Sequence, residues 1–354
     1  MGTQYQSLII RADANTQIGT GHLMRCLALA QAWKAQGGSA IFITACKSDF
    51  LLQRLHEEEF QVTQLEKTYP DPTDWEITSQ VLTAHPGAWV VLDGYYFDEA
   101  YQKRVKQAGH RLLVIDDMAH LDHYYADVVL NQNINAEKLW YSCEPYTQPL
   151  LGTQYVLLRR EFLQWRDWNR EIPAVARKVL VTLGGGDPDN VTLKIIRAIN
   201  KLKLRDLEVK VVIGPSNPHM VSLKEAIHYS PFTIQLLPAV RNMPELMAWA
   251  DIAISAGGTT CWELAFMGVP TITLELAKNQ QGIASGLDKA RLTLNLGWHT
   301  KTSIMWIANR LLRLLEDRKL RLKMSQKSRL LVDGLGGVRV VEFLLREHSN
   351  LEVS

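Results

Sequence analysis

The residues near the start of the chain that are best suited to chemistry are a histidine and the glycines before it. His22 directly follows Gly19-x-Gly21 in the segment IGTGHLMRC. An imidazole can transfer a proton near neutral pH, and glycines let a ligand approach the backbone closely. We therefore expect His22, Gly19 and Gly21 to face a substrate; the alternative is that His22 only fills the turn. Asp13, at the end of the preceding strand, either orients His22 or the loop and contacts substrate, or stabilises the turn.

This loop does not match the dinucleotide-binding fingerprint. Met24 stands where that pattern has its third glycine. The fingerprint also needs an acid roughly 20 residues further on to hold a ribose, but the next expected strand ends in Ala45 and Cys46. A redox dinucleotide domain is disfavoured, and we expect no cofactor.

A second cluster lies in the C-terminal half, in the segment SAGGTTCWEL. Gly257 and Gly258 permit close approach, and the hydroxyls of Thr259 and Thr260 stand beside the unpaired N–H groups of a helix start. This pattern predicts a diphosphate site. Glu263, one helical turn further on, is placed to accept both hydroxyls of a ribose. The alternative is an ordinary helix start with an exposed glutamate.

Other polar residues follow later strands of the expected fold. Asn279 and Gln280 lie in a polar loop able to reach a sugar or a phosphate. The turn GGGDPDN contains Gly185 and precedes a helix that we expect Asp189 or Asn190 to cap.

One group of carboxylates and imidazoles has the composition of a metal site. It comprises Asp116, Asp117, His120, Asp122 and His123. Such side chains can bind zinc or manganese. Nothing in the sequence shows that they converge, however, and a carboxylate at a strand end can instead cap a turn or bind substrate. We expect no metal.

The elements that must position these residues alternate along the chain. Short β-branched runs separated by amphipathic helices, such as those expected over 22–36, 49–58 and 97–108, are typical of parallel sheets covered on both faces. We therefore expect an α/β protein with two Rossmann-like, doubly wound domains and a ligand site in the cleft between them. The expected ranges are 1–160 for the N-terminal domain, 161–177 for a linker, 178–335 for the C-terminal domain, and 336–354 for a helix that could return to the first domain.

Composition narrows the class of protein. The chain has 354 residues, of which 47% are hydrophobic and 21% charged, with a net charge of +2. This balance gives no electrostatic reason to expect a nucleic-acid or membrane partner. Its four cysteines are scattered, and no signal peptide or long apolar run is apparent. We expect a cytoplasmic protein that binds a small molecule; the oligomeric state stays open.

Taken together, the motifs resemble one enzyme family. IRADANTQIGTGHLMRCLALA, VVLDGYY, IDDMAHLDHYYADVVLNQN, GGGDPDN, SAGGTTCWELAFMGVP, LAKNQ and VDGLGG occur in this order over nearly the whole chain. They look like the UDP-sugar hydrolases of pseudaminic acid biosynthesis, a family that includes spore-coat polysaccharide proteins. Its members are related to the glycosyltransferase MurG, which has the two-domain GT-B fold.

The resemblance implies a metal-independent hydrolysis of UDP-2,4-diacetamido-2,4,6-trideoxy-β-L-altropyranose to UDP and free sugar. His22 would be the general base that activates water, and Tyr95 and Asn279 would contact substrate. The segment from Gly257 to Glu263, with Gly185, would hold UDP. Two alternatives remain: a UDP-sugar glycosyltransferase of the same fold, and a non-catalytic UDP-sugar-binding subunit.

Overall fold

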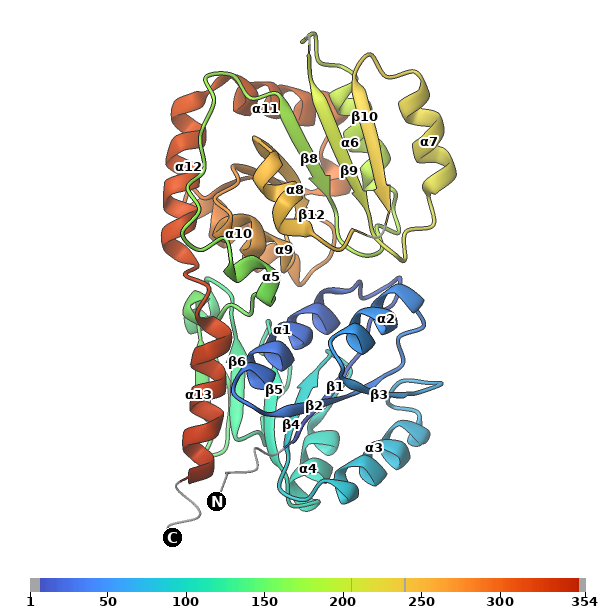
Figure 1. Cartoon of the computed structure of the whole chain (residues 1–354), viewed down its shortest axis with the longest axis vertical. Coiled ribbons are helices and arrows are strands. Elements are labelled where there is room, and N and C mark those ends of the chain that lie inside the picture. Colours follow the sequence, from blue (N-terminus) through green and yellow to red (C-terminus); the bar gives the residue numbers. More distant parts are fainter. Residues whose placement is uncertain (1–6, 205, 239, 350–354) are drawn as a thin grey trace. The chain divides into compact units, whose positions relative to one another are not determined.

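The apolar runs of the chain form two separate parallel β-sheets, each within its own folded unit (Figure 1). The computed structural model describes residues 7–204, 206–238 and 240–349. The first unit combines the chain up to Ala14, His22–Arg160 and the C-terminal segment from Gly334. The second combines Asn15–Gly21 with Glu161–Asp333.

The first sheet has seven parallel strands in the order β3-β2-β1-β4-β5-β6-β7. Its central strands are buried along nearly their whole length, as expected for a sheet covered on both faces. The strands are β1 (Ser7–Ala12), β2 (Ser39–Thr44), β3 (Gln61–Gln64), β4 (Trp89–Asp93), β5 (Arg111–Ile115), β6 (Val128–Asn131) and β7 (Gln148–Leu151).

Helices cover this sheet, and one of them comes from the far end of the sequence. The C-terminal helix contributes Val340, Val341 and Leu344 to the same core as the first strands and the first helix. The helices are α1 (Gly21–Ala35), α2 (Asp49–Glu57), α3 (Pro72–Ala84), α4 (Glu99–Gln107) and α13 (Gly336–Ser349), with single 3₁₀ turns η1 (Ala136–Lys138) and η2 (Thr153–Tyr155).

The second sheet has six parallel strands in the order β10-β9-β8-β11-β12-β13. The strands are β8 (Lys178–Thr182), β9 (Glu208–Ile213), β10 (Thr233–Pro238), β11 (Ile252–Ala256), β12 (Thr271–Glu275) and β13 (Thr293–Trp298). The helices are α6 (Val191–Ile199), α7 (Met220–His228), α8 (Met243–Trp249), α9 (Thr260–Phe266), α10 (Gln280–Lys289), α11 (Ile304–Glu316) and α12 (Arg318–Leu331), with η3 (His299–Lys301). The short α5 (Arg160–Leu163) stands where the chain passes from the first unit to the second.

The segment 161–177, which we expected to be a linker, packs on the second unit. Arg170 donates hydrogen bonds to the carbonyl oxygens of Met247, Ala250 and Met267. Arg321 Nη2, on α12, donates to the carbonyl of Pro173 at 2.7 Å. The half-buried Arg170 and the fully buried Arg321 thus attach this segment to its own unit.

Strand order decides where side chains can gather. In the first sheet β1 pairs with β4 through the partners Ala12 and Asp93, so the carboxyl ends of these strands lie side by side. In the second sheet β8 and β11 are neighbours through Thr182 and Ser255. The order of strands reverses at both places, and doubly wound sheets bind ligands at such switch points. None of the described helices is long and apolar enough to cross a bilayer.

Candidate functional site

His22 is held by a buried carboxylate at the switch point of the first sheet. It is the second residue of α1, and its Nδ1 lies 2.5 Å from Oδ1 of Asp93, the last residue of β4. Burial by itself would raise the pKa of the Asp93 carboxyl, but Arg25 and His22 outweigh it and lower that pKa well below its usual range. An ionised carboxylate only accepts hydrogen bonds, so Nδ1 carries the donating proton. In the neutral imidazole, Nε2 therefore presents a lone pair.

Arg25 connects Asp93 with a second carboxylate. Arg25 lies one helical turn after His22, on the same side of α1. Its Nε donates to Asp93 Oδ2 at 2.6 Å and its Nη2 to Asp93 Oδ1 at 2.7 Å. Its Nη1 donates to both oxygens of Asp117, at 2.9 and 2.8 Å. All three side chains are almost completely buried, which fixes the geometry around the imidazole.

Asp117 also accepts hydrogen bonds from two neutral side chains, each of which follows the end of another strand. Tyr95 Oη donates to Asp117 Oδ2 at 2.7 Å, and Asn133 Nδ2 donates to Oδ1 at 2.8 Å. The Tyr95 ring meets the His22 ring edge-on, with ring centroids 5.1 Å apart. Two carboxylates and one guanidinium give this group a net charge of −1 while His22 is neutral. The His22 imidazole therefore lies beside a net negative charge.

Asp13 belongs to a different network from His22. Asp13 Oδ1 accepts from Arg11 Nη1 at 2.7 Å and from the backbone N–H of Ala45 at 2.6 Å, and Oδ2 accepts from Tyr96 Oη. Burial alone would raise the pKa of the Asp13 carboxyl, but the bonds from Arg11 and Tyr96 lower it. Asp93, not Asp13, thus holds the imidazole; Asp13 ties the ends of strands together.

The carboxylates considered for a metal site point into different networks. Asp117 faces Arg25, whereas Asp116 accepts from His120 Nδ1 at 2.8 Å and from Tyr124 Oη. His123 Nδ1 lies 2.9 Å from Ser142 Oγ. Within the described residues, no group of three or more histidine, cysteine or acidic side chains has the geometry to hold a metal ion.

In the second unit, the SAGGTT segment lies at the switch point between β8 and β11. A Cβ on Gly257 would stand 3.0 Å from Ala284 Cβ and 3.1 Å from the carbonyl oxygen of Gln280, so this glycine allows α10 to come close. Thr260 begins α9, and Glu263 is half-buried on that helix. The predicted nucleotide residues from Gly257 to Glu263 therefore share one short stretch of backbone at the carboxyl edge of the sheet.

The loop before α10 is held by one of its own predicted residues. Gln280 Oε1 accepts a 2.9 Å hydrogen bond from the backbone N–H of Leu276. Asn279, the residue before α10, is half-buried. Gln280 thus shapes the loop that presents Asn279.

The glycine-rich turn after β8 is capped differently from our expectation. Asp187 accepts from the backbone N–H groups of Val191 and Thr192, at 2.7 and 2.9 Å. Asn190 occupies the N-cap position in a left-handed conformation but makes no side-chain cap bond. Asn190 thus stands at the expected N-cap position, but the capping hydrogen bonds come from the Asp187 side chain and not from Asp189 or Asn190. Buried Gly185, in the same turn, accepts from the backbone N–H of Ser216 at 3.0 Å.

Arg25 and Asp93 are the site residues that sequence reasoning missed. Arg25 stands in the motif IGTGHLMRC and Asp93 in VVLDGYY. The spacing of three between His22 and Arg25 on one helix was the available signal for Arg25. Asp93 ends a strand next to β1, but that adjacency exists only once the strand order is known.

Comparison with known proteins agrees with this architecture. Residues 179–333 match the model of the glycosyltransferase family 28 C-terminal domain. The chain is 25% identical over 337 residues to the spore coat polysaccharide biosynthesis protein SpsG of Bacillus subtilis, covering 95% of this chain and 96% of that protein. It is 23% identical over 287 residues to the UDP-2,4-diacetamido-2,4,6-trideoxy-β-L-altropyranose hydrolase of Campylobacter jejuni, covering 80% and 96%.

Another relative is longer than this chain. An uncharacterized protein of Methanocaldococcus jannaschii is 27% identical over 275 residues. The match covers 75% of this chain and 55% of that protein, so the chain spans about half of that relative's length.

Solved structures establish the fold. MurG of Acinetobacter baumannii superimposes with a TM-score of 0.63 at 15% identity, covering 96% of this chain and 99% of that one. A complex of MnaA from S. aureus with UDP has a TM-score of 0.68 at 16% identity, covering 98% and 97%. The chain therefore has the GT-B fold of two Rossmann-like domains, and its second domain matches the C-terminal domain of family 28 glycosyltransferases.

Proposed function

We propose that this protein is an enzyme that hydrolyses a UDP-linked diacetamido-trideoxyhexose to UDP and the free sugar. The substrate is UDP-2,4-diacetamido-2,4,6-trideoxy-β-L-altropyranose, and the reaction serves the synthesis of a pseudaminic-acid-type sugar acid. The observation that carries the proposal is the His22–Asp93 pair, whose tautomer leaves the Nε2 lone pair available. Similarity over 80% of the chain to the Campylobacter hydrolase supports this choice of substrate.

In this mechanism His22 is the general base. A water molecule gives a proton to His22 Nε2 while its oxygen forms a bond to the anomeric carbon. The bond between that carbon and the diphosphate oxygen breaks, and its electron pair leaves with UDP. A diphosphate is a good leaving group, so one base is sufficient. Asp93 stabilises the imidazolium, and Arg25 keeps Asp93 ionised.

Other predicted residues bind the nucleotide and the sugar. We place UDP at Gly185 and at the segment from Gly257 to Glu263, with the Glu263 carboxylate on the ribose hydroxyls. We assign the sugar to Tyr95 and to Asn279, with the turn from Gly19 to Gly21 beside it. The match of residues 179–333 to a family 28 C-terminal domain supports the nucleotide part of this proposal.

The decisive experiment measures UDP release with water as the only acceptor. Purified protein is incubated with the diacetamido UDP-sugar, and UDP and the reducing sugar are quantified together with a no-enzyme control. Equal amounts of both products would support hydrolysis. Release that needs an added acceptor would instead support a glycosyltransferase, the class suggested by the likeness to MurG. Tight UDP-sugar binding without release would support a non-catalytic subunit.

A further inference from the structure

A second imidazole of the first unit is fixed in the same way as His22. His120 lies in the loop after β5, and its Nδ1 is 2.8 Å from Oδ2 of Asp116. Burial would raise the pKa of the Asp116 carboxyl, but the hydrogen bonds from His120 and Tyr124 lower it. The ionised carboxylate accepts the Nδ1 proton, so the Nε2 of a neutral His120 presents a lone pair. The mechanism above does not use this group.

The loop that holds His120 contains a residue with a strained backbone. Ala119 has a φ of 52°, in the left-handed region that a residue with a Cβ rarely adopts. Asp116 fixes the turn on both sides of Ala119: Oδ1 accepts from the N–H of Met118 at 2.8 Å, and Oδ2 accepts from the N–H of His120 at 3.2 Å. A strained turn held by a buried carboxylate orients the ring that follows it.

Tyr95 connects the two histidines. Its ring meets His22 with centroids 5.1 Å apart and an interplanar angle of 83°, and it meets His120 at 5.7 Å and 88°. The two imidazoles therefore stand edge-on to one phenol ring at the same carboxyl edge of the sheet. Their side chains are 8% and 21% exposed, so His120 is the more accessible. Within the described part of the chain, His120 Nε2 has no hydrogen-bond partner from the protein.

We propose that His120 determines specificity by accepting, through Nε2, a hydrogen bond from an N–H or O–H group of the substrate sugar. The inference rests on the proposed function. A diacetamido sugar carries two amide N–H groups and a hydroxyl, the donors that this lone pair would recognise. His22 acts on water, whereas His120, on the other side of the Tyr95 ring, binds the sugar.

The test compares two substitutions at one position. His120→Ala removes the acceptor, whereas His120→Gln places an amide oxygen near the position of Nε2. We expect His120→Ala to raise KM for the diacetamido UDP-sugar about tenfold, the effect of one lost hydrogen bond, and to change kcat less. His120→Gln should restore most of the wild-type KM. Affinity for UDP alone should stay unchanged in both variants, since UDP lacks the diacetamido sugar.

Other outcomes would overturn the proposal. Wild-type KM in His120→Ala would exclude contact with the sugar, even if the wild-type enzyme hydrolyses it. Equal loss of kcat in both variants, with a lowered melting temperature, would indicate a purely structural role. If the wild type releases no UDP, calorimetric titration still decides: weaker binding of the UDP-sugar, but not of UDP, to His120→Ala supports the inference, and equal binding contradicts it.

Discussion

At the residue scale, the chemistry depends on which nitrogen of His22 carries the proton. Arg25 and His22 both donate to Asp93, so this carboxylate is saturated with donors and stays ionised. Catalytic triads orient their imidazole in the same way. In a triad the acid fixes the tautomer of the histidine and does not itself take the proton. Two substitutions separate these roles.

The first substitution removes the base and keeps its anchor. In His22→Asn the side-chain amide can still donate to Asp93, but the Nε2 lone pair is lost. We expect turnover to fall by about 10²–10⁴, the usual contribution of a general base, with UDP affinity within twofold of wild type. UDP release and UDP titration measure the two quantities, with the exposed His56→Asn as control. Retained turnover would exclude His22 as the base.

The second substitution keeps the base but changes its tautomer. In Asp93→Asn, Arg25 binds the single amide oxygen, so the amide N–H group faces His22 Nδ1. Nδ1 must then accept a hydrogen bond, and the proton of the neutral imidazole moves to Nε2. We expect kcat to fall by about 10³–10⁴, as when the acid of a triad becomes an amide. Steady-state kinetics measure the loss, with exposed Asp122→Asn as control. Activity close to wild type would mean that Asp93 does not set the tautomer.

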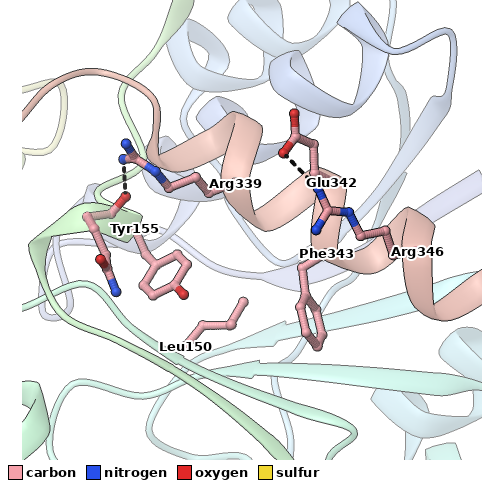
Figure 2. Close-up of a pocket in the computed structure, with 7 residues that line it drawn as sticks. Leu150, Tyr155, Arg339, Glu342, Phe343 and Arg346 are labelled. Carbon is pink, nitrogen blue, oxygen red and sulfur yellow. Dashed lines mark hydrogen bonds and ion pairs between the residues drawn. The ribbon is translucent and has the colours of Figure 1, made fainter.

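At the element scale, the C-terminal helix α13 depends on a close approach of backbones. A Cβ on Gly336 would stand 2.2 Å from the carbonyl oxygen of Val156. Further along the helix, Arg339 Nη1 donates to the carbonyl of Gln154 at 2.8 Å. Figure 2 shows Phe343 pointing toward Leu150 of β7, beside a cavity of about 230 Å³. The glycine thus allows the start of the helix to dock.

Replacing this glycine tests the docking. Gly336→Ala forces the start of α13 away from η2, and we expect the free energy of unfolding to fall by about 1–3 kcal/mol. Glu342→Ala on the same helix is the control. The Glu342 carboxylate is exposed and its ion pair with Arg346 is long, at 3.8 Å, so this substitution should change the free energy of unfolding by less than about 0.5 kcal/mol. Denaturant unfolding measures both. Equal stabilities of the two variants would show that the start of α13 yields easily.

The elements that were predicted least well are those without an apolar signature. Edge strand β3 has the sequence QVTQ and is only partly buried. It therefore contains neither a run of apolar residues nor a long alternation of apolar and polar residues from which a strand could be predicted. The buried strands β1, β4 and β5 are continuous apolar runs of the kind from which we expected parallel sheets. The seven-strand sheet was thus predictable at its centre and not at its edge, where burial imposes the weakest constraint on sequence.

At the scale of the whole molecule, the second folded unit is the one to which we assign UDP. Glu263→Ala should lower UDP affinity by roughly 10–100-fold, because in our proposal this carboxylate accepts two charge-assisted hydrogen bonds from the ribose. Calorimetric titration with UDP measures this change, and exposed Glu245→Ala, in the same unit, is the control. Unchanged affinity in Glu263→Ala would contradict the ribose assignment.

The sequence by itself determined the local features: the two α/β halves, the glycine turns at Gly19–Gly21 and Gly257–Gly258, and His22 as the candidate base. These depend on residues close together in the chain. Only the tertiary structure decided the partners of His22 and Arg25. Asp93 and Asp117 lie 68 and 92 residues from Arg25, and parallel pairing of β1, β4 and β5 brings their carboxylates together. Strand order is a long-range property, and the spacing of residues along the chain does not encode it.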